Sequence, residues 1–148
     1  MTPWLFLAVL AFLGGGRASS AEVPFERVAG PEMAGFRQRV TGIRGAKPSV
    51  QIEKRGDRAA VVAALGEKRT GGYEIEIHKI ELRGKTLLVT ARITEPARDA
   101  FVTQALTYPA DAVWVDAKRL KPAENALRLI LVDEKGKVLA KRGPGAAK

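Results

Sequence analysis

Residues 73–94, YEIEIHKIELRGKTLLVTARIT, decide the fold of this chain. Apolar side chains alternate with glutamates up to Ile77 and resume, one position out of step, at Ile80. Alternation with a period of two predicts a strand with one buried face. The change of parity predicts a β-bulge near His78 and Lys79, because a bulge inserts one extra residue into a strand.

A tight turn, Arg83-Gly84-Lys85, divides this stretch in two. After the turn, alternate residues from Leu87 to Ile93 are apolar and face inwards, while the threonines and the arginine between them face outwards. Two runs of this kind joined by a short glycine-containing turn predict a β-hairpin. The sequence therefore indicates two long antiparallel strands.

Strands are also indicated on both sides of this hairpin. RAAVVAAL at residues 58–65 is apolar on both faces, which predicts a central strand covered on both sides. FVTQALTYP at 101–109 resumes an extended pattern, and a short strand surrounds Trp114, whose indole is either a core residue or an exposed anchor. A last hairpin has arms at 127–132 and 138–141.

The N-terminal part is expected to be extended as well. VPFERV and FRQRVTGIR are interpreted as two strands joined around Gly30-Pro31, and the sequence shows no heptad, internal repeat or convincing long helix. The fold class is all-β, a compact antiparallel β-sandwich or open barrel of about seven to nine short strands. The expected divisions are N-terminal strands at 22–58, a core at 59–116, a linker and C-terminal hairpin at 117–142, and a flexible tail at 143–148.

Residues 1–21 are expected to be a secretory signal peptide. An apolar run from Trp4 to Leu13 precedes small residues that favour cleavage after Ala21. The run is shorter than the ~20 residues that span a bilayer, so a membrane anchor is not expected. The chain has no cysteine, which excludes a lipoprotein anchor and a disulfide scaffold. We expect a periplasmic or secreted protein.

The chain is strongly basic, with 25 Lys and Arg against 16 Asp and Glu and a formal net charge of +9. Such a charge favours anionic partners. Export, and the lack of a basic run interleaved with aromatic residues, argue against nucleic acid. An anionic component of the cell envelope stays open as a partner.

The residues available for catalysis are few. After Ala21 the chain has one serine, Ser49, and one histidine, His78. A serine nucleophile with its base, or a zinc site with four ligands, would have to be built around this pair. We expect no enzyme activity, no metal and no cofactor.

A separate question is raised by LGEKRTGGYEI at residues 65–75. The glycine pair does not fit a phosphate-binding loop, because the spacing is wrong and a strand follows rather than a helix. The glycines can take positive φ and form a turn between strands, and such a turn can at the same time contact a partner. The candidate partner-binding loop comprises Lys68, Arg69, Thr70, Gly71, Gly72 and Tyr73.

The ordered series LGEKRTGGYEIEIHKIE, LLVTARITEP and VTQALTYPADAVWV resembles the C-terminal domain of the PrcB family, over about residues 59–115. Ala110 departs from the family pattern, which usually has an aromatic residue there. The founding member is a subunit of a secreted protease complex. The resemblance implies a binding or accessory role without enzymatic activity, with another exported protein such as a peptidase as the partner. Besides the TGGY segment, the motif residues are Gly66, Pro96, Thr103, Gln104, Thr107, Tyr108 and Pro109.

A second resemblance leads to an alternative function. Inhibitors of cysteine peptidases of the chagasin type insert a loop reading Asn-Pro-Thr-Thr-Gly and then Tyr or Phe into the cleft of the enzyme. This chain is similar at Thr70, Gly72 and Tyr73, but it has Lys68 and Arg69 in place of the Asn-Pro pair and Gly71 in place of the second Thr.

Overall fold

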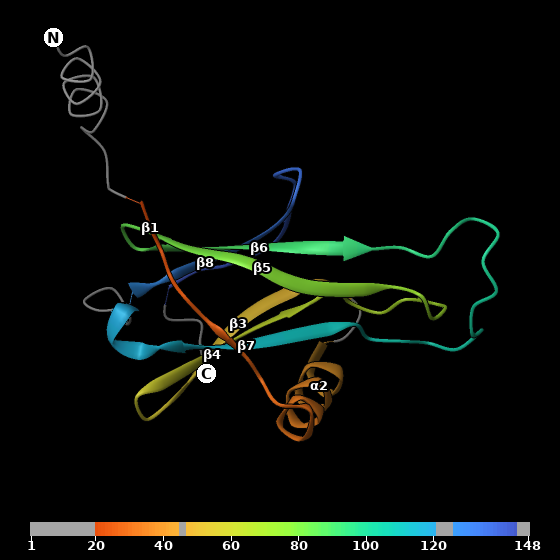
Figure 1. Cartoon of the computed structure of the whole chain (residues 1–148), viewed down its shortest axis with the longest axis horizontal. Helices are drawn as coiled ribbons and strands as arrows, with labels where there is room; N and C mark the ends of the chain where they lie inside the picture. The colour runs from red at the N-terminus through yellow and green to blue at the C-terminus, as the bar shows by residue number, and fades with distance from the viewer. Residues whose placement is uncertain (1–19, 45–46, 121–125, 145–148) are drawn as a thin grey trace, which may run out of the picture.

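Two β-sheets face each other, and one helix lies on the outer side of the second sheet (Figure 1). The computed structural model describes residues 20–44, 47–120 and 126–144, so the expected signal peptide lies outside the described residues except for Ser20 and Ala21. The strands are β1 (Ser20–Glu22), β2 (Glu26–Arg27), β3 (Ser49–Arg55), β4 (Arg58–Ala64), β5 (Glu74–Arg83), β6 (Thr86–Thr94), β7 (Ala110–Asp116), β8 (Arg128–Asp133) and β9 (Val138–Arg142). The helices are α2 (Gly30–Arg44) and a short 3-10 helix, η1 (Ala117–Leu120).

The first sheet has the strand order β1-β5-β6-β8-β9, and the second has the order β2-β7-β4-β3. This arrangement confirms the all-β sandwich and the predicted number of strands. One pairing, β6 with β8, is parallel, which departs from the antiparallel pattern expected throughout. The cause is the connection, because the chain crosses to β7 in the other sheet between β6 and β8, and a crossover joins parallel strands.

The central strand β4 is covered on both faces, as its sequence predicts. Ala59, Val61 and Ala63 belong to the main core between the two sheets. Ala60 and Val62, on the other face, belong to a second cluster beneath the helix. Trp114 is 4 % exposed and lies in this second cluster, so its indole is a core residue and not an exposed anchor.

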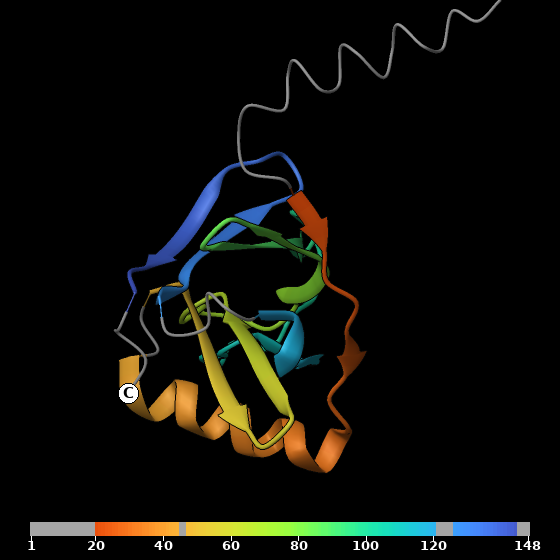
Figure 2. The ribbon, with the colours of Figure 1, turned by 90° about the vertical axis from the view of Figure 1, so that its left-hand side faces the viewer.

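The helix α2 corrects the prediction of two N-terminal strands. VPFERV contributes only the two-residue strand β2, and FRQRVTGIR is helical. Pro31 lies in the first turn, where a missing N–H removes no helical hydrogen bond, and Met33 N donates to the carbonyl oxygen of Ala29 at 2.9 Å. Met33 and Phe36 are buried against β7 and β4. The Phe36 and Trp114 rings pack edge to face, with their centroids 5.9 Å apart. Figure 2 shows the helix lying across the outer face of this sheet.

The central hairpin has the predicted form. Strands β5 and β6 pair in antiparallel fashion, and the turn between them has a positive φ of 62° at Gly84. The register shifts between Ile77 and Lys79, which confirms the bulge. The C-terminal hairpin of β8 and β9 is also confirmed.

The segment FVTQALTYP does not form the extended strand that the sequence indicated. Strand β7 begins only at Ala110, and before it the chain makes a single β-bridge, between Thr107 and Lys68. Residues 95–109 are therefore a long loop, and loops of this length in a compact domain are commonly functional.

Two hydrogen bonds of Ile77, at the bulge of β5, with Arg27 on β2 and with Asp111 on β7 join the sheets along one side. The guanidinium of Arg27 on β2 bonds the carboxylate of Asp111 on β7 and donates to the carbonyl oxygen of Ile77 at 2.6 Å. The same carboxylate accepts the N–H of Ile77 at 2.7 Å. Because both backbone groups of Ile77 point away from β6, and β1 pairs only with residues 81–83 of β5, these side chains take the place of a neighbouring strand.

The described helices were also considered as membrane spans. Within residues 20–44, 47–120 and 126–144, no helix combines the length and apolar character needed to cross a membrane.

Candidate functional site

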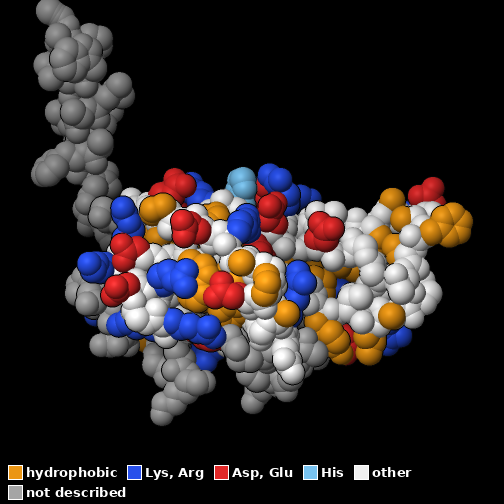
Figure 3. All heavy atoms as spheres, turned by 60° about the horizontal axis from the view of Figure 1, so that its bottom comes forward, with side chains coloured by type: hydrophobic (Ala, Val, Ile, Leu, Met, Phe, Trp, Pro, Cys, Tyr) orange, Lys and Arg blue, Asp and Glu red, His pale blue; other side chains and the backbone are white. Residues whose placement is uncertain are grey.

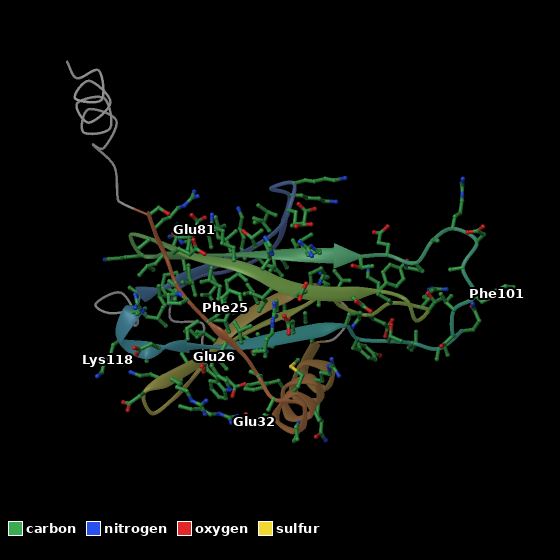
Figure 4. The ribbon with its side chains drawn as sticks, in the orientation of Figure 1. Phe25, Glu26, Glu32, Glu81, Phe101 and Lys118 are labelled. Carbon is green, nitrogen blue, oxygen red and sulfur yellow. The ribbon has the colours of Figure 1, made fainter. Side chains whose placement is uncertain are left out.

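The two segments that carry the motif residues lie side by side at one end of the sandwich (Figure 1). The first is residues 66–73, between β4 and β5, and the second is residues 95–109, between β6 and β7. We call these two segments together the double loop. It projects beyond the ends of the strands, opposite the end that carries Lys118 (Figure 4).

Hydrogen bonds connect the two segments along their length. Lys68 and Thr107 exchange two backbone hydrogen bonds, each 2.8 Å long, and Gly71 N donates to the carbonyl oxygen of Thr103 at 3.0 Å. The Thr107 hydroxyl adds a bond of 2.8 Å to the carbonyl oxygen of Thr70. The ladder between β4 and β7 thus continues, less regularly, into the double loop.

The glycines have different roles in this packing. Gly72 has φ +91°, and a Cβ atom there would lie 2.7 Å from the Cβ of Pro96 and 3.1 Å from a methyl group of Val102. Gly66 is buried and has φ 89°. Gly71 does not have positive φ, contrary to the prediction for the pair, and lies in ordinary contact distance of Thr103. Gly72 is therefore the position at which the two segments require glycine.

Polar side chains at the base of the double loop are also paired. The Tyr108 hydroxyl donates to a carboxylate oxygen of Glu67 at 2.8 Å. This hydrogen bond, with smaller effects of desolvation and of the Glu67 charge, raises the pKa of Tyr108 above its ordinary value of 10.0. The ammonium of Lys68 lies 5.1 Å from the centre of the Tyr73 ring, a cation–π distance. Lys68 thus contacts its own loop, whereas Arg69 is exposed.

The outer part of the double loop, residues 100–106, follows the exposed charged residues Arg98 and Asp99 and is itself uncharged and partly apolar. The Phe101 side chain is 105 % exposed and Leu106 is 57 % exposed, and no charged residue occurs in residues 100–110. Figure 4 shows Phe101 at the far end of the molecule, directed away from the sheets. In Figure 3 hydrophobic and uncharged side chains cover most of this end, while Lys and Arg gather towards the other. Gln104 is exposed on the same loop.

Sequence reasoning missed Phe101 and Leu106 because FVTQALTYP was interpreted as a strand. An uncharged, partly apolar run that no alternation explains was the available signal. In a chain with 28 % charged residues, such a run is either buried or a contact surface. Here it is exposed.

Two hollows flank Tyr73, which lines both. One, of about 400 Å³, lies between the start of β5 and the start of β7 and is also lined by Arg37, Glu74 and Ile75, together with residues 107–111. The other, of about 620 Å³, is lined by apolar residues that include Leu65, Ile93 and Leu139 and by charged residues of both signs.

The two residues considered for catalysis lie in different sheets. Ser49 begins β3 in the second sheet, and His78 lies exposed at the bulge of β5 in the first. Among the residues that the structure describes, no group of three or more His, Asp or Glu side chains is placed to hold a metal ion.

A β-sandwich with a motif-bearing double loop at one end defines the class of this protein as a small all-β domain with its distinctive residues on loops. Residues 59–116 match the family described as PrcB C-terminal, which confirms the resemblance seen in the sequence over this segment. The matched segment contains the whole double loop. Comparison with curated proteins gave no significant match, and neither did comparison with solved structures.

Proposed function

We propose that this chain is an exported, non-catalytic accessory module that binds a partner protein, such as a subunit of a protease complex, through the outer part of the double loop. The family match over residues 59–116 supports an accessory role. The expected signal peptide supports export, and it is the basis for placing the partner outside the cytoplasm.

The observation that carries this proposal is the exposure of Phe101 on a loop that is held in place. The loop is bonded to residues 68–71 and packs over Gly72. A large aromatic side chain that is fully exposed has no role in its own core, and aromatic residues are enriched at the centres of protein interfaces. A preformed loop also loses little conformational entropy on binding.

Capture of partners from the native host by the exported protein tests the proposal. Phe101→Ser is expected to weaken binding by about 2 kcal/mol, typical of a central interface aromatic residue, which is about a 30-fold loss of affinity. Val138→Ser is the matched control, because Val138 is 47 % exposed but lies on β9, outside the double loop.

Equal recovery of every partner by wild type and Phe101→Ser would show that the outer part of the double loop does not bind the partner. Arg69→Glu separates the charge contribution, since Arg69 is exposed while Lys68 contacts Tyr73. If Arg69→Glu is the only variant that fails, the partner is held by charge and not by Phe101.

The inhibitor alternative has less support from the geometry. Residues 68–71 are bonded along one side to residues 103–107, so the segment is one wall of the double loop and not a free wedge. Rates of a papain-like peptidase at micromolar concentrations of the protein decide this directly. We expect no slowing, and slowing that depends on Thr70 and Gly72 would restore the alternative.

Export is tested separately, by measuring the intact mass of the protein recovered outside the cytoplasm. The cut expected after Ala21 falls within β1, which pairs Ser20 with Arg83 and Ala21 with Leu82. A mass that begins at Glu22 would agree with the predicted cut. Recovery of the full-length chain from the cytoplasm alone would contradict export.

A further inference from the structure

The outer edge of β5 is covered by different partners along its length. Towards its C-terminal end it pairs with β1, and Val23 N donates to the carbonyl oxygen of Ile80 at 2.8 Å. At the bulge, Asp111 and Arg27 satisfy the N–H and the carbonyl of Ile77. The outward backbone groups of β5 are therefore bonded as far as Ile77.

The next outward position is Ile75. Backbone groups of alternate residues in a strand point to the same edge, so the N–H and the carbonyl of Ile75 point the same way as those of Ile77, away from β6. Ile75 lies opposite Ile93 of β6 in register. Within the described residues no hydrogen bond meets these outward groups, and Ile75 lines the hollow of about 400 Å³.

The opposite wall of this hollow, at the start of β7, also has backbone groups that point outward from its sheet. Leu65 N donates to the carbonyl oxygen of Pro109 at 2.9 Å, which makes the facing pair Ala64 and Ala110 a non-hydrogen-bonded pair of the ladder. The backbone of Ala110 therefore points away from β4, like that of Ala112, whose carbonyl oxygen accepts from Val28 N at 3.3 Å. Both walls thus present strand backbone to the hollow.

We infer that this hollow is a site for β-strand addition, which takes a short extended, uncharged segment of a partner protein along the edge of β5 at Ile75. An extended peptide is the ligand that matches a row of outward N–H and carbonyl groups. The inference rests on the proposed function, because it names how the partner is held beside the double loop.

The volume of the hollow and the charges of its lining determine the length and the charge of the ligand that fits. A strand residue fills roughly 160 Å³, given a rise of about 3.3 Å, a strand spacing of about 4.8 Å and a sheet spacing of about 10 Å. About 400 Å³ thus accommodates about two to three residues. Arg37 and Glu74 carry opposite charges at the rim, and Asp111 is paired with Arg27, so the lining favours uncharged side chains.

The test uses the capped tetrapeptide acetyl-Val-Thr-Val-Thr-amide at millimolar concentration, with amide hydrogen exchange followed by NMR. In the free protein the Ile75 amide is expected to exchange at least about tenfold faster than the Ile77 amide, because only the latter is bonded. The peptide is expected to slow Ile75 exchange at least about tenfold and to leave Phe101 unchanged. The matched ligand is the same peptide with every backbone nitrogen methylated, which cannot pair with a strand.

A covalent block provides the second arm, since the chain has no cysteine of its own. Unreacted Arg37→Cys is the reference for this arm, and the same variant after reaction with N-benzylmaleimide is expected to lose the peptide binding of the unreacted variant, because the added group fills the hollow. Unchanged Ile75 exchange with the peptide, or equal protection by the methylated peptide, overturns the inference. Neither result affects the outcome of the capture experiment with Phe101→Ser, so one proposal can be refuted while the other stands.

Discussion

Gly72→Ala is the substitution whose effect the structure determines most closely. Gly72 has φ +91°, which costs a residue with a Cβ about 1 to 2 kcal/mol. The new methyl group would also lie 2.7 Å from the Cβ of Pro96 and 3.1 Å from Val102. Overpacking of this kind costs about 1 to 3 kcal/mol more. We expect a loss of about 2 to 5 kcal/mol from the free energy of unfolding, a large part of the 5 to 15 kcal/mol typical of a domain.

Two other glycines separate these contributions. Gly136 has φ +87° with nothing within 4 Å of an added Cβ, so Gly136→Ala reports the backbone cost alone, about 1 to 2 kcal/mol. Gly71 has neither a positive φ nor a close contact, so Gly71→Ala should stay within about 1 kcal/mol of wild type. The expected order of destabilisation is Gly72, then Gly136, then Gly71.

Urea unfolding measures all three variants with one probe. Trp114 is buried and is the only tryptophan outside the expected signal peptide, so its fluorescence reports unfolding of the domain. If Gly72→Ala lost no more stability than Gly136→Ala, the two segments of the double loop would not be packed as tightly as described. A loss at Gly71 equal to that at Gly72 would contradict the assignment of separate roles.

Three further predictions concern other contacts. The pKa of Tyr108, measured by the absorbance of tyrosinate, should exceed 10.0 and should fall in Glu67→Gln. The hydrogen bond from Tyr108 to Glu67 stabilises the fold at pH values below the unfolded-state pKa of about 10, and this stabilisation is lost as pH rises through the raised pKa of the folded state. Asp111→Ala should lower the free energy of unfolding by about 1 to 3 kcal/mol, because the Ile77 N–H loses its acceptor, and Asp111→Asn should cost less. Phe36→Ala should cost about 3 to 5 kcal/mol in the same urea assay, since the ring is fully buried between α2 and the sheet.

The strands that contain a clear two-residue period and the continuous apolar strand β4 were predicted correctly, whereas the helix α2 and the loop at 101–109 were not. The bulge near His78 could be predicted because one extra residue shifts every later apolar side chain to the other parity. The helix was missed although Met33, Phe36, Val40 and Ile43 recur at helical spacing, because polar residues between them resembled strand alternation. For β4, the sequence predicted cover on both faces but not that α2 supplies it.

For the candidate site, the motif residues were identified from the sequence and their spatial relation was not. Gly72 and Pro96 are distant in the chain, and only the folded structure shows that the missing side chain of one makes room for the ring of the other. The exposure of Phe101 was equally inaccessible, since an apolar residue in a run without periodicity is compatible with a core or a surface position.

The sequence by itself determined the local geometry of this protein, because the apolar period sets which face of each strand avoids water and glycine sets where the chain can turn. It therefore specified the hairpin of residues 73–94, the bulge and the buried strand at 58–65. The tertiary structure alone decided which edges meet, because backbone hydrogen bonds and side-chain contacts between distant segments leave no periodic signal. The pairing of the double loop, the bonds from Arg27 and Asp111 to Ile77, and the outward backbone groups of Ile75, which no hydrogen bond from the described residues meets, all belong to that second group.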